Sequence, residues 1–81
     1  MRVTVRLFAR LRELAGSGEF DVDARDGSTV DDVWRDLAGR YPGLERFGGS
    51  VSAAVNGEFA RRSAALADGD EVAFLPPVSG G

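Results

Sequence analysis

The alternation of apolar and polar residues at the start of the chain predicts a β-strand. In the stretch RVTVRLF, which spans residues 2–8, every second side chain is apolar. Successive side chains of a strand point to opposite faces of a sheet. We therefore expect Val3, Val5 and Leu7 to face the core and Phe8 to lie on the other side.

A longer apolar period in the middle of the chain predicts one main helix. Ser28 or Thr29 can cap its amino end, and Pro42 ends it. Apolar side chains recur every three or four residues along one face of this helix, at Val30, Val33, Trp34, Leu37 and Tyr41. The stretch ARLRELAG predicts a shorter helix before it, which ends at Gly16.

Turn signals divide the remaining sequence into further strands. EFDVDA alternates, with Phe20 and Val22 inward, and VSAAVNGEFA predicts a hairpin whose type I′ turn is Asn-Gly. EVAFL predicts a last strand with Val72 and Phe74 inward. The order strand, helix, strand, helix and two or three strands predicts an α+β fold, in which a mixed sheet of four to five strands wraps one main helix.

Strand alternation also predicts an apolar patch on the outer side of this sheet. Leu75 follows an inward Phe74, and the two-residue hairpin places Phe59 opposite to the core. If the first and last strands are parallel neighbours, Phe8 and Leu75 lie at the same end of the sheet. An exposed apolar patch of this kind is typical of a surface that binds a partner.

Composition excludes several classes of function. The 81 residues form one domain, and 43% hydrophobic and 28% charged residues are typical of a soluble globular protein. Without Cys or His, the chain has no thiolate nucleophile, no Ser-His-Asp triad and no zinc site built from those ligands. We therefore do not expect an enzyme on its own, or a metal site.

The charge pattern argues against nucleic acid as a partner. The formal net charge is −3, and all ten basic residues are Arg. A nucleic-acid-binding domain normally carries a basic patch. The acidic stretch DVDARDG does not match the spacing of a calcium loop, so we interpret it as a solvated turn. Neither a signal peptide nor an apolar run long enough to span a membrane is present, so we expect a cytoplasmic protein.

The last residues, FLPPVSGG, predict an extended arm after the last strand. Two prolines fix their φ angles and lack amide donors, so the strand cannot fold back on itself. Six extended residues reach roughly 20 Å. Two glycines without side chains could pass through a channel too narrow for other residues. We expect residues 1–75 to form the folded domain and residues 76–81 an extended, flexible C-terminal tail.

Taken together, these stretches resemble the MoaD/ThiS family of ubiquitin-like sulfur carriers, and within it the small subunits of molybdopterin synthases. The resemblance covers almost the whole chain, through LFARLRELAG, STVDDVWRDLAGRYP, AAVNGEFA and DGDEVAFLPPVSGG. It implies a β-grasp fold and no cofactor bound by this chain. It also implies two partners: a ubiquitin-activating-type adenylyltransferase that uses ATP with Mg, and a large catalytic subunit with which the chain forms a heterotetramer.

The resemblance also assigns roles to residues. The carboxylate of Gly81 would be adenylated and then converted to a thiocarboxylate, whose sulfur passes to cyclic pyranopterin monophosphate in molybdenum cofactor biosynthesis. Phe8, Phe59 and Leu75 correspond to the hydrophobic surface that binds partners, and Arg12 in LREL is a further interface contact. The arm that carries the reactive end consists of Pro76, Pro77, Val78, Ser79 and Gly80.

Two other functions remain open. A sulfur carrier for another pathway, such as thiazole synthesis for thiamine, also ends in Gly-Gly, but such relatives are typically shorter and lack the LRELAG helix. A ubiquitin-like protein modifier would form isopeptide bonds through Gly81. Because the chain contains no Lys, such a modifier could not build Lys-linked polymers of itself. A plain interaction module would leave the closing motif without a role.

Overall fold

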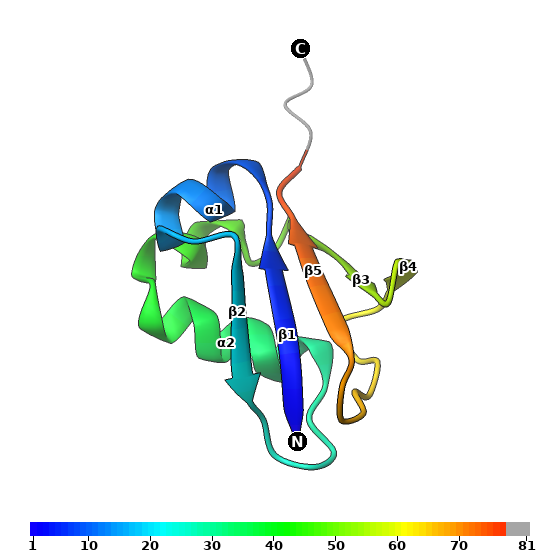
Figure 1. The fold of residues 1–81 in the computed structure, drawn as a ribbon. Coiled ribbons are helices and arrows are strands. Elements are labelled where there is room, and N and C mark those ends of the chain that lie inside the picture. The colour runs from blue at the N-terminus through cyan, green and yellow to red at the C-terminus, as the bar shows by residue number, and fades with distance from the viewer. Residues whose placement is uncertain (78–81) are drawn as a thin grey trace.

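The computed structural model describes residues 1–77 and shows a β-grasp fold (Figure 1). One five-stranded mixed sheet has the strand order β2-β1-β5-β3-β4. In chain order the elements are β1 (Arg2–Leu7), α1 (Ala9–Ala15), β2 (Glu19–Asp23), α2 (Val30–Arg40), the 3₁₀ helix η1 (Pro42–Phe47), β3 (Ser52–Val55), β4 (Glu58–Ala60) and β5 (Glu71–Leu75). The predicted α+β class and the sheet around one main helix are confirmed.

The first and last strands are parallel neighbours at the centre of the sheet. Leu7 of β1 lies opposite Phe74 of β5, while β2 and β3 flank this pair in antiparallel orientation. Both central strands therefore end at the same edge of the sheet, beside α1 (Figure 1). The predicted hairpin joins β3 to β4 through Asn56 and Gly57, whose φ angles of 50° and 86° suit a type I′ turn.

The core lies between the sheet and the helices. Trp34 of α2 packs against Phe74 of β5, with their ring centroids 5.1 Å apart. No polar or charged residue is buried within residues 1–77. The buried residues are Val3, Val5, Leu7, Leu11, Val22, Val30, Val33, Trp34, Leu37, Leu44, Val51, Ala53, Leu66, Val72 and Phe74. Phe20 and Tyr41, which were also predicted to face inward, are only partly buried, because their rings stack on each other at the margin of the core, with centroids 5.8 Å apart.

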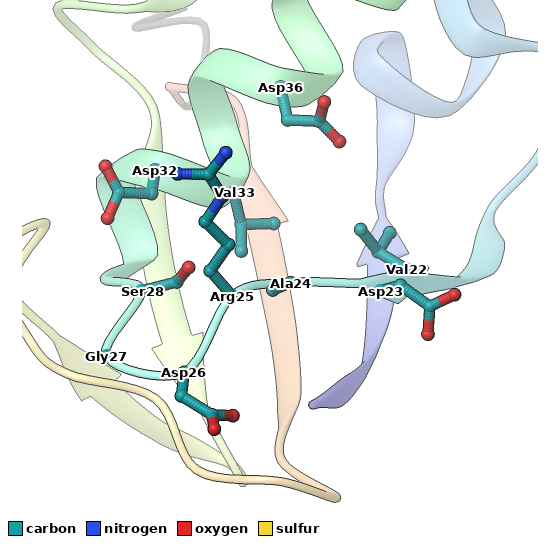
Figure 2. A pocket seen from close by; sticks show the side chains of 10 residues that line it. All are labelled: Val22, Asp23, Ala24, Arg25, Asp26, Gly27, Ser28, Asp32, Val33 and Asp36. Atoms are coloured by element: carbon teal, nitrogen blue, oxygen red, sulfur yellow. The ribbon is translucent and has the colours of Figure 1, made fainter.

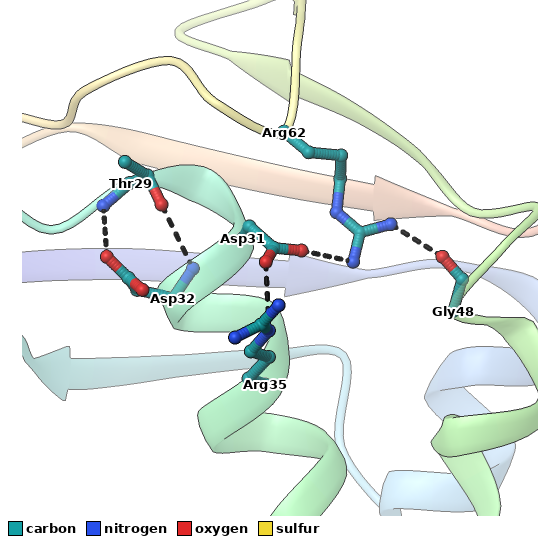
Figure 3. Close-up of polar contacts among 6 residues, drawn as sticks. All are labelled: Thr29, Asp31, Asp32, Arg35, Gly48 and Arg62. Carbon is teal, nitrogen blue, oxygen red and sulfur yellow. Dashed lines mark hydrogen bonds and ion pairs between the residues drawn. The ribbon is translucent and has the colours of Figure 1, made fainter.

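The backbone amides at the amino end of α2 donate hydrogen bonds to neighbouring groups, some of which are drawn in Figure 3. Thr29 is the N-cap: its hydroxyl accepts a hydrogen bond from the Asp32 amide, and the Asp32 carboxylate accepts one from the Thr29 amide. The amides of Val30 and Asp31 donate to backbone carbonyls of Ala64 and Arg62. The donors that a helix terminus usually leaves free are thus satisfied, which fixes α2 in place.

Two features of the fold were not predicted from the sequence. Residues Pro42–Phe47 form η1, for which the sequence analysis predicted no element, and its Leu44 is fully buried. The guanidinium of Arg62 bridges Asp31 and the carbonyl of Gly48, at 2.7 Å each, and so joins α2 to the segment that follows η1 (Figure 3). The first strand also ends one residue earlier than expected, because Phe8 is the N-cap of α1.

Candidate partner-binding interface

The outer face of the sheet, the face away from α2, carries the most exposed large apolar side chain among the described residues. Phe59 lies in the edge strand β4 and is 85% exposed. Its cross-strand neighbour is Ala54 of β3, so its side chain has little to pack against. Phe59 therefore lies on the side that strand alternation predicted, and a ring so exposed can contact another protein without any change in the core.

Phe8 and Leu75 lie at the end of the two central strands. Leu7 pairs with Phe74, so the next residues along the two parallel strands are also neighbours. These residues are Phe8 and Leu75, at the carboxyl ends of the strands. Phe8 is 39% exposed and Leu75 is half-buried. The guanidinium of Arg6 lies over the Phe8 ring, 5.7 Å from its centroid. We call Phe8, Phe59 and Leu75 the apolar patch.

Small side chains fill the outer face between these larger residues. Ala73 of β5 pairs with Ala54 of β3, which in turn pairs with Phe59. A methyl group rises little above the backbone of a sheet, so a partner can approach this half of the sheet closely. Ala73 was not singled out from the sequence, although the alternation EVAFL already placed it beside Leu75 on the outer side.

The other half of the outer face is charged. Arg6 of β1 lies 3.6 Å from a carboxylate oxygen of Glu19 and 4.0 Å from one of Glu71. Thr4 donates a hydrogen bond to Asp21. These groups are paired within the chain and exposed to solvent. Charged residues therefore occupy β2, β1 and the start of β5 on the outer face, whereas the rest of β5 and the strands β3 and β4 are largely apolar there, through Ala73, Leu75, Ala54 and Phe59.

Arg12 lies on α1 next to Phe8 and is exposed. Its side chain extends along Gly18, where an added Cβ would come within 3.1 Å of its Cδ and Nε atoms. Together with Phe8 and Gly18 it lines a hollow of about 390 Å³. No carboxylate of residues 1–77 forms an ion pair with Arg12, so its charge is free to meet an acidic group of another molecule.

The tail begins at this same edge of the sheet. Pro76 is half-buried and Pro77 is exposed, directly after Leu75. Val78, Ser79, Gly80 and Gly81, to which the sequence analysis assigned the arm and the reactive end, lie outside the described residues.

A second hollow, of about 520 Å³, lies beside the β2–α2 loop (Figure 2). Figure 1 shows this loop at the end of the molecule opposite to the end of β5. It is formed by the β2–α2 loop and the start of α2, and its lining includes Asp23, Asp26, Asp32 and Asp36. The hydrogen bond that the Asp32 carboxylate accepts from the Thr29 amide is the main reason that the pKa of Asp32 lies below its ordinary value. None of the predicted site residues up to Pro77, where the described part of the chain ends, lines this hollow.

The described residues contain no cluster of potential metal ligands. Within residues 1–77, no group of three or more acidic side chains is placed to hold a metal ion. No helix in the same part of the chain is long and apolar enough to cross a membrane. Among the described residues, the apolar patch and Arg12 at the start of the tail form a surface suited to binding another protein.

Comparison with protein families places these features in context. The model of the ThiS family matches residues 5–81. The chain is 37% identical to the molybdopterin synthase sulfur carrier subunit of Chlamydomonas reinhardtii, over the full length of both chains. It is 43% identical to small archaeal modifier protein 1 of Haloferax volcanii, over 94% of this chain and 97% of the relative.

Solved structures agree with these matches. The crystal structure of the Haloferax volcanii modifier superposes with a TM-score of 0.88 at 40% identity, and all of both chains is covered. A protein–protein complex of subunits 1 and 2 of the molybdopterin-converting factor from Helicobacter pylori contains a chain that matches with a TM-score of 0.69 at 28% identity, again over the full length of both.

Proposed function

The chain belongs to the ThiS family of ubiquitin-like sulfur carriers, and we propose that within this family it is the small subunit of a molybdopterin synthase. A member of this family carries sulfur and is not itself catalytic. In the proposed role, the domain formed by residues 1–75 is recognised by partners, and the tail formed by residues 76–81 delivers its end into the active site of the large subunit.

The chemistry of the proposed reaction explains why the carrier needs an activating partner. A free terminal carboxylate has a pKa of ~3.5, so at neutral pH it is ionised and a poor electrophile. An oxygen of the Gly81 carboxylate attacks the α-phosphorus of ATP, held with Mg by the adenylating partner, and pyrophosphate leaves. Sulfide (HS⁻) from the sulfur source then attacks the acyl carbon, AMP leaves and the thiol proton is lost to solvent. The product is the thiocarboxylate that donates sulfur to cyclic pyranopterin monophosphate.

The observation that supports this role best is the position of the apolar patch around the start of the tail. A carrier must be bound where its tail leaves the domain. Leu75 directly precedes Pro76, Phe8 lies beside Leu75 at the end of the neighbouring strand, and Phe59 lies on the same outer face. Full-length identity to curated sulfur carrier subunits of molybdopterin synthases adds to it. A relative in the Helicobacter pylori complex is paired with the second subunit of its converting factor.

The direct experiment is reconstitution of molybdopterin formation with variants of the last residue. Deletion of Gly81, or addition of one residue after it, should abolish adenylation and sulfur transfer and leave the melting temperature unchanged. Full-length protein with the natural end is the control. Molybdopterin formation by the shortened chain at the normal rate would disprove the carrier role.

A second function, modification of other proteins, is favoured by one observation: 43% identity to small archaeal modifier protein 1. In that role, a lysine amine of a target attacks the activated acyl carbon of Gly81, AMP leaves, and an isopeptide bond forms. The chain has no Lys, so each modified lysine should carry one copy. Peptide mapping of conjugates from cells tests this directly, and copies branched through internal side chains would contradict it.

A further inference from the structure

One residue beside the apolar patch has a backbone conformation that its side chain does not favour. Ala9 has a φ angle of 51°, in the left-handed region. Among residues 1–77, the other non-glycine residue with positive φ is Asn56, which occupies a hairpin turn where asparagine is common. Alanine has no polar side chain to stabilise this conformation, and its Cβ crowds the backbone there.

The unusual conformation occurs where the chain passes from strand to helix with a single residue between them. β1 ends at Leu7 and α1 begins at Ala9. Phe8, the residue between them, is the N-cap of α1, with φ −121° and ψ 155°, and makes no capping hydrogen bond through its side chain. Phenylalanine is a poor N-cap compared with Ser, Thr, Asp or Asn. Two local preferences are therefore violated at adjacent positions.

The sharp turn has a clear consequence for the surface. Leu7, before it, and Leu11, after it, are both buried in the core. Phe8, between them, is exposed at the edge of the sheet, with the Arg6 guanidinium over its ring. The residues on both sides of Phe8 are thus held in the core, while the Phe8 ring is exposed beside the start of the tail.

We propose that Ala9 is a positioning residue, whose left-handed backbone holds the Phe8 ring in one orientation for the partner. Backbone conformations of this kind persist only where the surrounding structure enforces them, and they concentrate at functional sites. A ring that is already fixed loses less conformational entropy on binding. The inference rests on the proposed function only for the identity of the partner, because the order of the Phe8 ring is a property of the free protein.

The test is Ala9→Gly. Glycine adopts positive φ without crowding, so the melting temperature of the variant should equal or exceed that of the wild type. Glycine also lets the junction move, so the Phe8 ring should sample several χ1 rotamers, where scalar couplings in the wild type report one. With less ordering in the free state, affinity for the large subunit should fall about threefold to tenfold, with KM for the carrier raised and kcat unchanged.

The matched control is Ala15→Gly, in the same short helix but at negative φ. It should lower the melting temperature, because glycine disfavours an ordinary helical position, and leave both affinity and the Phe8 rotamer unchanged. A double-mutant cycle with Phe8→Ala completes the design: in the Phe8→Ala background, Ala9→Gly should have no further effect on affinity.

The outcomes separate this inference from the proposed function. A single Phe8 rotamer or unchanged affinity in Ala9→Gly would overturn the positioning role, even if Phe8→Ala weakens binding. Equal losses of affinity from Ala9→Gly with and without Phe8 would overturn it too. Failure of the wild type to bind the large subunit would count against the proposed function alone, since the rotamer measurement needs no partner.

Discussion

The two faces of the sheet are built from the same strands and serve different purposes. On the inner face, Phe74 of β5 is fully buried against Trp34. One residue later, Leu75 lies on the outer face at the start of the tail, and Phe59 of β4 is 85% exposed. Two phenylalanines thus occupy opposite environments: Phe74 is fully buried on one face, and Phe59 is the most exposed large apolar residue of residues 1–77 on the other.

This difference shows that apolar composition alone does not assign a role to a residue. Burial of a large apolar side chain stabilises the fold by about 1.5–3 kcal/mol, and exposed residues such as Phe59 do not make that contribution in the free protein. They can make it when a partner covers them. Changes on the inner face should therefore act on stability, and changes on the outer face on binding.

The largest effect is expected on the inner face, from Phe74→Ala. Removal of a fully buried ring leaves a cavity beside Trp34 and should destabilise the fold by about 3–5 kcal/mol, measured by urea denaturation. The milder Phe74→Leu should stay folded well enough for binding assays and retain nearly normal affinity for the large subunit. A strong loss of affinity in folded Phe74→Leu would break the separation of the two faces.

The next largest effect is expected on the outer face, from Phe59→Glu. A carboxylate desolvated against an apolar partner should weaken binding at least tenfold, or about 1.4 kcal/mol, while the melting temperature barely changes. Binding and unfolding should both be measured by calorimetry on the same preparation. Glu58→Gln, at the exposed neighbouring position, is the control. A large loss of stability would mean that Phe59 supports the core; unchanged affinity would place the interface elsewhere.

A smaller effect on stability alone is expected from Thr29→Ala. The change removes the hydroxyl that accepts a hydrogen bond from the Asp32 amide, and loss of an N-cap costs about 1 kcal/mol. Thr29 lies at the amino end of α2, remote from the apolar patch, so affinity should not change. Thr29→Ser, which keeps the hydroxyl, should restore most of the stability in the same denaturation assay.

The smallest expected effect is a loss of stability in acid. A hydrogen bond from the Thr29 amide lowers the pKa of Asp32, and hydrogen bonds from the Ala67 amide and the Asn56 side chain lower the pKa of Asp70. A carboxyl whose pKa is lower in the folded state stabilises the fold above its unfolded pKa of about 3.9, and this stabilisation is lost as the pH falls through the folded value. The free energy of unfolding should be measured between pH 6 and pH 2, in steps of about half a pH unit. When both residues are replaced by Asn, it should fall less steeply with decreasing pH. An unchanged pH profile would show that these bonds do not contribute.

Much of the sheet could be predicted because strand alternation has a strict period of two. It placed Val3, Val5, Val72 and Phe74 in the core and put Phe59 on the opposite face. The contacts of Arg62 could not be predicted, since its partners Gly48 and Asp31 are 14 and 31 residues away. They become neighbours only after the strands have paired.

The positive φ angle of Ala9 could not be predicted for a related reason. Alanine favours helix and gives no sign of positive φ, and its conformation follows from two flanking leucines that are both drawn into the core. The start of α1 likewise has no capping side chain that would mark it. The role of Gly81 rests on the sequence and on the family, because this residue lies outside the described structure.

The most direct test of the carrier role is to locate the sulfur. The protein should be treated with ATP, Mg, the adenylating partner and a sulfur donor, and its intact mass measured before and after. Exchange of one carboxylate oxygen for sulfur adds about 16 Da, and digestion at Arg should place this gain in the peptide that follows Arg62 and ends at Gly81. Because the chain has no Cys, no thiol can hold the sulfur as a persulfide.

The gain should disappear when the large subunit and the pterin precursor are added. No gain, or a gain in any other peptide, would contradict the carrier role.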